Sequence, residues 1–380
     1  MKLNFSFAEN WNELKKFNNL NDEQRSIVFY AENKASMNHF RLLILELTEE
    51  RNFQICYITS VKNDPILSIN DKNILAFYIG DGIVRTKFFL ELKAKILIMD
   101  MPDLDSFHIK RSKIFPVHYI YIFHSMFSVH SYLRKGAVDN YDTIFCVGEH
   151  HKREILETEK IYGLKPKKLV DYGFGRLDTL LKEQSNFKKE ELNTKNLIII
   201  APTYGNSNLL KICGVKLIET LLDSNFKVLL RPHFRIFKES KDLIKIILDK
   251  FQNNNNFLLE EGIIKPQIFH SSRCMISDWS GISLEYAFVF ERPIIYIDVP
   301  KKELNAEVDK IDLQPIEVSI REKIGYLVEP DNLTEIPNII SEINDESRAE
   351  QIRDIRSKTV FNIGKSASIG ADHITEILEK

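Results

Sequence analysis

The sequence predicts an α/β protein of two domains, each built on a parallel β-sheet covered by helices. Short runs of β-branched and aromatic residues alternate with segments that have helical spacing of apolar residues, a pattern typical of parallel sheets buried on both faces. The pattern stops near residue 190 and then restarts. A chain of 380 residues is also long enough for two domains, at ~100–200 residues per domain.

The first predicted domain comprises residues 1–185. Its predicted strands are residues 26–30, 53–59, 74–79, 95–99, 119–123 and 143–147. Its predicted helices include residues 39–47, 84–92 and 151–158. Continuously apolar strands separated by helices indicate parallel pairing, because a parallel connection needs a crossover that a helix usually supplies.

The second predicted domain comprises residues 186–380. Its predicted strands are residues 196–201, 227–230, 273–276 and 293–298, and its predicted helices include residues 209–222, 243–251, 282–290 and 371–380. The polar and charged stretch 182–195 is the predicted linker. Ligands of open α/β sheets bind beyond the carboxyl ends of the strands. The polar residues that directly follow the strands are therefore the candidates for a site.

Composition excludes several classes of protein. The net charge of −2 argues against a protein that binds nucleic acid through bulk charge. No apolar run approaches the ~20 residues of a membrane span, and the N-terminus lacks the apolar core of a signal peptide. The four cysteines are far apart, without the spacing of a zinc site, which suits a reducing compartment. We expect a cytoplasmic protein, and contact with the inner face of the cytoplasmic membrane stays open.

The first candidate site follows the predicted strand 119–123 and contains His124, Ser125, Ser128 and His130. An imidazole at the carboxyl end of a strand can reach a ligand, and near neutral pH it can accept a proton from a hydroxyl, as a general base must. The other reading is a hydrogen-bonded histidine packed at the strand edge. Position alone favours neither reading.

Arg231 and His233 follow the predicted strand 227–230 in the same way, with Pro232 fixing the backbone between them. A guanidinium fork beside an imidazole suits a phosphate or a diphosphate. A loop with two solvated side chains is the alternative. The position at a strand end favours the functional reading.

The segment SDWSG lies between the predicted strand 273–276 and the predicted helix 282–290. Ser280 and Gly281 fall at the helix N-terminus, where backbone N–H groups attract anions. An ordinary N-cap explains the same residues without a ligand. Glu285 either reaches ribose hydroxyls or is a first-turn acid. The polar residues preceding the helix are Ser277, Asp278 and Ser280.

Three further features have a structural alternative. Thr203 and Gly205 in APTYG either approach a donor molecule or line the cleft between the domains, and a plain turn is equally compatible with the sequence. Arg176 and Asp178 in GFGRLD are expected to pair and fix the crossover between the domains. The basic stretch 108–113 is read as a solvated charge run rather than a contact for lipid head groups. The remaining lone histidines are read as structural or solvated: His39, His108, His118, His270 and His373.

Six short motifs occur in a fixed order: FHS at 123–125, YDTIFCVGEHH at 141–151, GFGRLD at 173–178, APTYG at 201–205, RPH at 231–233 and SDWSGISLEYAF at 277–288. Over roughly residues 115–330, their order and spacing resemble the CDP-glycerol glycerophosphotransferase family of teichoic-acid and capsule synthesis. The resemblance implies the GT-B architecture, two Rossmann-like domains with the active site between them. It also implies transfer of glycerol phosphate, or another polyol phosphate, from a CDP-activated donor to a hydroxyl of a lipid-linked or glycan acceptor, with release of CMP.

The resemblance also implies roles for individual residues. His124 is the base, and His233 is a second essential imidazole at the donor phosphates. Ser277, Asp278 and Ser280 hold the donor diphosphate. Residues assigned by position are Arg231, Gly281, Glu285, Thr203 and Gly205 on the donor side, and Ser125, Ser128 and Arg176 on the acceptor side. No Asp-rich site is evident, so we expect no metal ion and no cofactor, with charge stabilised by helix dipoles and side chains.

Family members commonly have His-Gly where this chain has His124-Ser125, so we expect a different acceptor loop. Two other functions would use the same fold. One is a glycosyltransferase that uses a nucleotide sugar in surface polysaccharide synthesis. The other is a non-catalytic binding protein, which is disfavoured because both histidines and the helix-terminal serine are present together.

Overall fold

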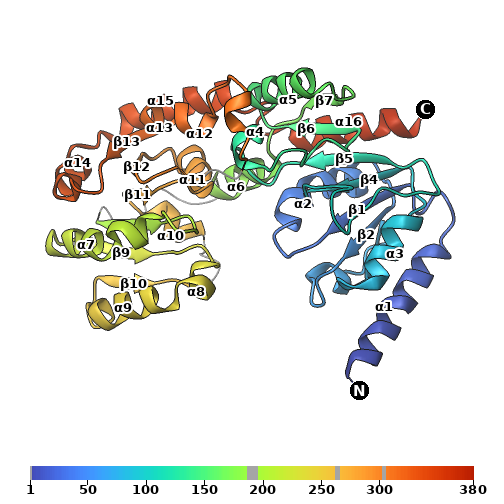
Figure 1. The fold of residues 1–380 in the computed structure, drawn as a ribbon, viewed down its shortest axis with the longest axis horizontal. Coiled ribbons are helices and arrows are strands. Elements are labelled where there is room, and N and C mark those ends of the chain that lie inside the picture. Colours follow the sequence, from blue (N-terminus) through green and yellow to red (C-terminus); the bar gives the residue numbers. More distant parts are fainter. Residues whose placement is uncertain (1, 186–195, 262–265, 302–304) are drawn as a thin grey trace. The chain divides into compact units, whose positions relative to one another are not determined.

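The computed structural model describes residues 2–185, 196–261, 266–301 and 305–380, and the statements below concern these residues. The chain forms two compact units, each described by itself (Figure 1). The first unit comprises Met1–Thr179, Asn305–Asp312 and Thr359–Lys380. The second comprises Leu180–Leu304 and Leu313–Lys358.

The first unit is built on a seven-stranded parallel sheet of order β3-β2-β1-β4-β5-β6-β7. Its strands are β1 (Ile27–Ala31), β2 (Ile55–Thr59), β3 (Ile74–Tyr78), β4 (Ile96–Met99), β5 (His118–Ile122), β6 (Thr143–Cys146) and β7 (Lys168–Asp171). Its helices are α1 (Lys2–Asn18), α2 (Met37–Leu45), α3 (Ile83–Glu91), α4 (Val129–Tyr132), α5 (Glu149–Tyr162), the start of α6 (Gly175–Ser185) and α16 (Ser366–Leu378). Short turns of other helix types lie at Glu46–Glu50, Pro65–Ser68 and Val308–Lys310.

Helices cover both faces of this sheet. All five residues of β1 are buried, as expected for a central parallel strand. On one face, residues of α2 and α16, including Phe40, Leu43 and Ile374, join the core cluster of the sheet. On the other face, Phe17 of α1 packs on Phe88 of α3 with ring centroids 5.4 Å apart. These aromatic side chains bury the apolar area that holds the layers together.

The second unit is built on a six-stranded parallel sheet of order β10-β9-β8-β11-β12-β13. Its strands are β8 (Leu197–Ala201), β9 (Lys227–Leu230), β10 (Phe257–Leu259), β11 (Cys274–Ser277), β12 (Ile294–Ile297) and β13 (Gly325–Val328). Its helices are α7 (Leu209–Asp223), α8 (Ile236–Glu239), α9 (Lys241–Phe251), α10 (Pro266–Ser271), α11 (Ile282–Phe290), α12 (Ile316–Ser319), α13 (Arg321–Ile324), α14 (Ile336–Glu342) and α15 (Asp345–Thr359). A further short helical turn lies at Leu333–Glu335.

Both sheets have the strand order of a Rossmann fold, so the predicted fold class is confirmed. Each has a switch point where the chain reverses direction across the sheet, between β1 and β4 in the first unit and between β8 and β11 in the second. At such a point the loops after the two strands diverge, which is where ligands of these folds bind.

The end of the chain departs from the predicted division at residue 185. Residues 359–380, placed in the second domain from the sequence, belong to the first unit. Asp178 of α6 holds this C-terminal segment on the first unit. Its carboxylate accepts hydrogen bonds from the Gly364 N–H (2.7 Å) and from the Ser366 hydroxyl (2.5 Å) at the start of α16. Most of the predicted linker 182–195 lies outside the described residues, and residues 182–185 form the end of α6.

All four cysteines are buried and free. Across the described ranges, every helix is too short or too polar to cross a membrane.

Candidate functional site in two parts

At the switch point of the first unit, a buried carboxyl group joins the loops after β1 and β4. Asp100 directly follows β4, and its Oδ1 accepts a hydrogen bond of 2.9 Å from the Ser36 hydroxyl at the start of α2. Burial raises the pKa of Asp100 to about 6. The backbone carbonyl of the same residue faces the next strand along the sheet, where it contacts His124.

His124 lies just beyond the carboxyl end of β5 and is partly buried. Its Nδ1 is 3.3 Å from the carbonyl oxygen of Asp100. Because a carbonyl oxygen can only accept, the Nδ1 carries the proton and the Nε2 of the neutral ring is left as an acceptor. Burial lowers the pKa of His124, while the bond to the carbonyl acts in the opposite direction. The ring is therefore neutral at pH 7 and suited to take a proton at Nε2.

The loop that carries His124 is held by side chains of α5. Glu154 accepts a hydrogen bond from the Val129 N–H (2.5 Å) and lies 3.1 Å from the Nδ1 of His130. The Nε2 of His151 contacts the carbonyl of Phe127 at 2.8 Å. Backbone groups of Phe127 and Val129 thus bond to polar side chains of one helix, which fixes the position of the loop.

The remaining acceptor-side candidates differ in accessibility. Ser125 is partly exposed and accepts a hydrogen bond from the Phe127 N–H (3.2 Å). Ser128 is almost completely buried. Arg176 is partly exposed in the first turn of α6. The Asp178 carboxylate, which was expected to pair with Arg176, accepts hydrogen bonds from Gly364 and Ser366.

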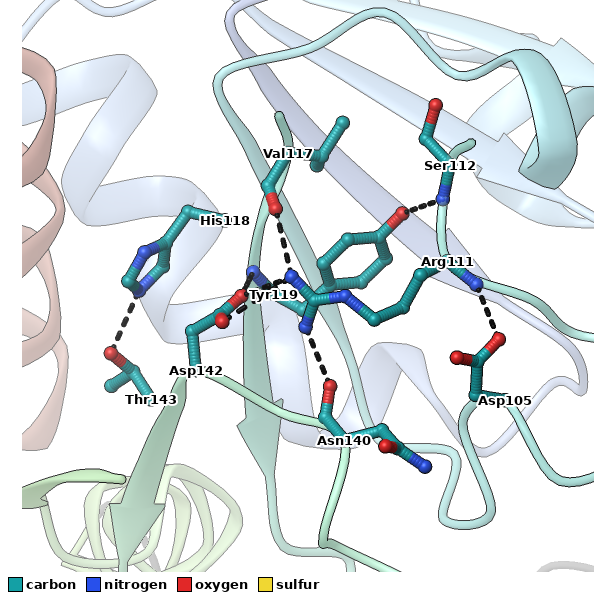
Figure 2. A network of polar contacts seen from close by, with 9 residues as sticks. All are labelled: Asp105, Arg111, Ser112, Val117, His118, Tyr119, Asn140, Asp142 and Thr143. Carbon is teal, nitrogen blue, oxygen red and sulfur yellow. Dashed lines mark hydrogen bonds and ion pairs between the residues drawn. The ribbon is translucent and has the colours of Figure 1, made fainter. Parts of the chain in front are cut away.

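The basic stretch 108–113 is partly internal (Figure 2). The guanidinium of Arg111 pairs with Asp142 (2.9 Å) and lies over the ring of Tyr119 at 4.3 Å. The same guanidinium also donates to the carbonyl of Asn140 at 2.6 Å. Figure 2 shows these groups converging at the start of β5. Arg111 therefore anchors the segment before β5, and the reading of the whole stretch as a solvated run is corrected at this position.

The second unit repeats the arrangement at its own switch point. Asp278 follows β11 and is almost completely buried. Its Oδ1 accepts a hydrogen bond from the Thr203 N–H (2.7 Å) in the loop after β8, and its Oδ2 accepts one from the Leu209 N–H (3.0 Å) at the start of α7. The Ser277 hydroxyl donates to the carbonyl of Ala201 (2.7 Å). These two side chains thus hydrogen-bond to the protein's own backbone at the switch point. Their role in holding a donor diphosphate stays a prediction.

We expect the Asp278→Asn variant to unfold more easily at pH 7, by about 1–3 kcal/mol, because an amide has one acceptor oxygen for two backbone N–H groups. Urea denaturation measures the change, with Asp249→Asn, at an exposed position of α9, as the control. An Asp278→Asn midpoint equal to that of wild type would contradict the role given to this carboxylate.

The same pair of proteins gives a pH test. Burial raises the pKa of Asp278 to about 6, whereas an unfolded aspartate titrates near ~3.9. A group with a raised native pKa stabilises the fold most below the unfolded pKa and loses that contribution as pH rises to the native pKa. The stability advantage of wild type over Asp278→Asn is therefore expected to shrink between pH ~4 and ~6 and then level off.

Arg231 and His233 follow β9, next to β8 in the sheet. The backbone N–H of Arg231 donates to the carbonyl of Ile200 (2.8 Å), and its guanidinium lies 5.9 Å from the Phe269 ring. The His233 ring lies 4.5 Å from the Tyr204 ring. The Nδ1 of His233 accepts from the Arg235 N–H at 3.3 Å, so in the neutral ring the Nε2 carries the proton and is a donor.

The helix-terminal candidates lie at the start of α11. Gly281 is the N-cap residue of α11. The carbonyl oxygen of Ser280 accepts a hydrogen bond from the Ser283 hydroxyl (2.8 Å). Glu285 is partly buried in the first turn. Gly205 has φ +115°, a conformation that favours glycine, so it makes the turn after β8. The structure thus gathers the donor-side candidates at the carboxyl ends of β8, β9 and β11.

Sequence reasoning gave no role to Ser36 and Asp100 of the first unit, and it read His39 as structural or solvated. Asp100 could have been found, because it follows a predicted strand directly, as Asp278 does. His39 occupies a position within an apolar helix face and gives no comparable signal. Among the residues that the structure describes, no three His, Cys, Asp or Glu side chains are placed to hold a metal ion.

Comparisons with known proteins agree on the fold. A variant of the wall teichoic acid polymerase TagF soaked with CDPG has a TM-score of 0.61 at 16% identity, covering 100% of this chain and 99% of that one. The UDP-GlcNAc 2-epimerase of Methanocaldococcus jannaschii has a TM-score of 0.58 at 15% identity, covering 92% and 99%. The enzyme of Neisseria meningitidis bound to UDP-GlcNAc has a TM-score of 0.59 at 15% identity, covering 92% and 99%.

No curated protein sequence matches this chain. At these identities the likeness to solved structures shows the fold, which is GT-B-like, with two parallel-sheet α/β domains. The match of sequence to a family covers residues 14–306, most of the chain. The chain therefore belongs to the CDP-glycerol:poly(glycerophosphate) glycerophosphotransferase family and is a glycerophosphotransferase enzyme.

Proposed function

We propose that this enzyme transfers glycerol phosphate, or a related polyol phosphate, from CDP-glycerol to a hydroxyl of a lipid-linked or glycan acceptor. CMP is the second product, and the reaction serves the synthesis of a teichoic-acid-like or capsule polymer. Membership of the family supports the donor. A lipid-linked acceptor would bring the enzyme to the inner face of the cytoplasmic membrane.

The observation that carries this proposal is that the His124 and His233 rings are protonated on different nitrogens, Nδ1 in His124 and Nε2 in His233. The Nδ1 of His124 bonds to a carbonyl, which leaves Nε2 as an acceptor. The Nδ1 of His233 bonds to a backbone N–H, which leaves Nε2 as a donor. Attack of a hydroxyl on a diphosphate needs a group of each kind, one to take the hydroxyl proton and one to bind phosphate oxygens.

The step balances with these groups. The acceptor oxygen attacks the phosphorus that carries glycerol, and a new phosphorus–oxygen bond forms while its proton passes to the Nε2 of His124. The bond from that phosphorus to the bridging oxygen breaks, and CMP leaves with the electron pair. Arg231, His233 and the N-terminus of α11 offset the charge that develops on the phosphates. Ser277 and Asp278 hold the loop after β8 in place.

A donor panel tests the proposal. The purified chain is incubated with CDP-glycerol, CDP-ribitol, UDP-GlcNAc and a GDP-sugar, with a glycerol-phosphate-terminated acceptor in each case. We expect CMP from a CDP-polyol and no nucleotide release from the sugar nucleotides. Turnover of a sugar nucleotide alone, with both CDP-polyols intact, would contradict the proposal and favour a glycosyltransferase.

A further inference from the structure

A buried histidine, His39, lies beside His124. The His39 side chain belongs to a residue that is only 7% exposed, and within the described residues its Nδ1 has no hydrogen-bond partner. Leaving a buried polar atom unbonded costs about 1–3 kcal/mol. Such a group in a native structure calls for an explanation, and a ligand that the site normally binds is one.

The surroundings of His39 identify the chemistry of that ligand. Its ring centroid lies 6.3 Å from that of His124 and 5.8 Å from that of Phe174. Burial holds the pKa of His39 well below its usual value, and the nearby His124 and the charge of Arg176 lower it further. The imidazole is therefore neutral, and the positive charge near it comes from the guanidinium of Arg176.

The start of α6 adds to this positive character. Gly175 lies against the backbone of α2. A Cβ atom at this position would be only 3.5 Å from the carbonyl oxygen of His39. The first N–H groups of an α-helix lack intrahelical acceptors and carry partial positive charge. The start of α6 thus lies against the backbone of His39, whose ring is beside that of His124, and the charge of Arg176 acts on the same ring. The nearby Asp100 carboxyl is bonded to Ser36.

We propose that His39, Arg176 and the N-terminus of α6 bind a phosphate group of the acceptor, with His124 beside them to activate its hydroxyl. The proposal rests on the proposed transferase function and adds the residues that recognise the acceptor. Guanidinium groups and helix N-termini are the common phosphate binders of proteins. A polyol phosphate chain end carries its phosphate and its free hydroxyl only a few bonds apart. A phosphate at His39 would therefore place that hydroxyl near the ring of His124.

The test measures binding in the absence of turnover, with sn-glycerol 3-phosphate as the probe of the acceptor end. Isothermal titration compares wild type with His39→Gln and Arg176→Gln. The matched control is His118→Gln, which alters another imidazole of the same unit at the opposite end of β5, bonded to Thr143. Glycerol replaces the probe to show whether the phosphate group is required. CDP-glycerol affinity is measured for each variant.

We expect sn-glycerol 3-phosphate to bind wild type and His118→Gln equally and to bind His39→Gln and Arg176→Gln about tenfold or more weakly. Glycerol is not expected to bind, and CDP-glycerol affinity is expected to stay unchanged. Equal probe affinity of wild type and both site variants, or absence of probe binding to wild type, would overturn the proposal. Arg176 is partly exposed, so its variant keeps the test valid even if His39→Gln fails to fold. Failure of the donor panel would remove the transferase function separately, because probe binding needs no donor.

Discussion

Replacing His124 with Gln is expected to lower the rate of glycerol phosphate transfer by about 10²–10⁴-fold, while CDP-glycerol affinity changes little. The size follows from the usual contribution of a positioned general base. Gln can still donate to the carbonyl of Asp100, as His124 does now, but it offers no group that takes a proton near pH 7. Single-turnover measurement of CMP formation separates the chemical step from donor binding.

The control for this experiment is His108→Gln, which removes an exposed imidazole of the same unit. Its rate is expected to equal that of wild type. If His124→Gln transfers glycerol phosphate at the wild-type rate, His124 is not the base. A loss of donor affinity with an unchanged rate constant at saturation would instead make His124 a binding residue.

The largest effect on donor binding is expected when Arg231 and His233 are both replaced with Ala. Hydrogen bonds to charged groups contribute about 1.5–3 kcal/mol each, so the double variant is expected to bind CDP-glycerol about 100-fold or more weakly. Each single variant is expected to lose about tenfold or more. Titration calorimetry with CDP-glycerol measures the loss, and CMP as a competing ligand shows how much of it concerns the nucleotide phosphate.

The matched control is Arg235→Ala, two residues after His233. Its guanidinium is exposed and pairs with Glu239 (2.7 Å), and its backbone N–H still bonds to the Nδ1 of His233. This variant is expected to keep wild-type donor affinity. Unchanged affinity in the Arg231→Ala, His233→Ala double variant would remove the anion-binding role of the loop after β9.

The central strands of both sheets could be predicted from the sequence, and three edge strands could not. β1, β4, β6, β11 and β12 are buried along their whole length, so their sequences are continuous apolar runs. β7, β10 and β13 lie at the sheet edges and are partly exposed, which breaks the apolar run. The return of α16 to the first unit involves hydrogen bonds that Asp178 accepts from Gly364 and Ser366, which are far away in sequence, and local patterns do not encode such contacts.

Some residues of the candidate site could likewise be predicted from the sequence, and others could not. Position after a strand places His124, Arg231 and His233 at the carboxyl edges of their sheets, as the topology shows. Position after a strand does not reveal which polar side chains hydrogen-bond to the protein's own backbone. The Asp278 carboxylate accepts from the N–H groups of Thr203 and Leu209, and the Ser277 hydroxyl donates to the carbonyl of Ala201. The same criterion also misses His39, because a histidine on the inner face of a helix has the same pattern as a core residue.

The most direct test follows the oxygen atom of the acceptor hydroxyl during the reaction. An acceptor labelled with ¹⁸O at its terminal hydroxyl is incubated with the enzyme and CDP-glycerol, and the products are examined by ³¹P NMR. We expect the new phosphodiester to show the isotope shift of phosphorus bonded to ¹⁸O, with one unlabelled CMP formed for each bond. A product whose phosphorus carries no label, or CMP formed without a new phosphodiester, would show that the acceptor hydroxyl does not attack the donor phosphorus.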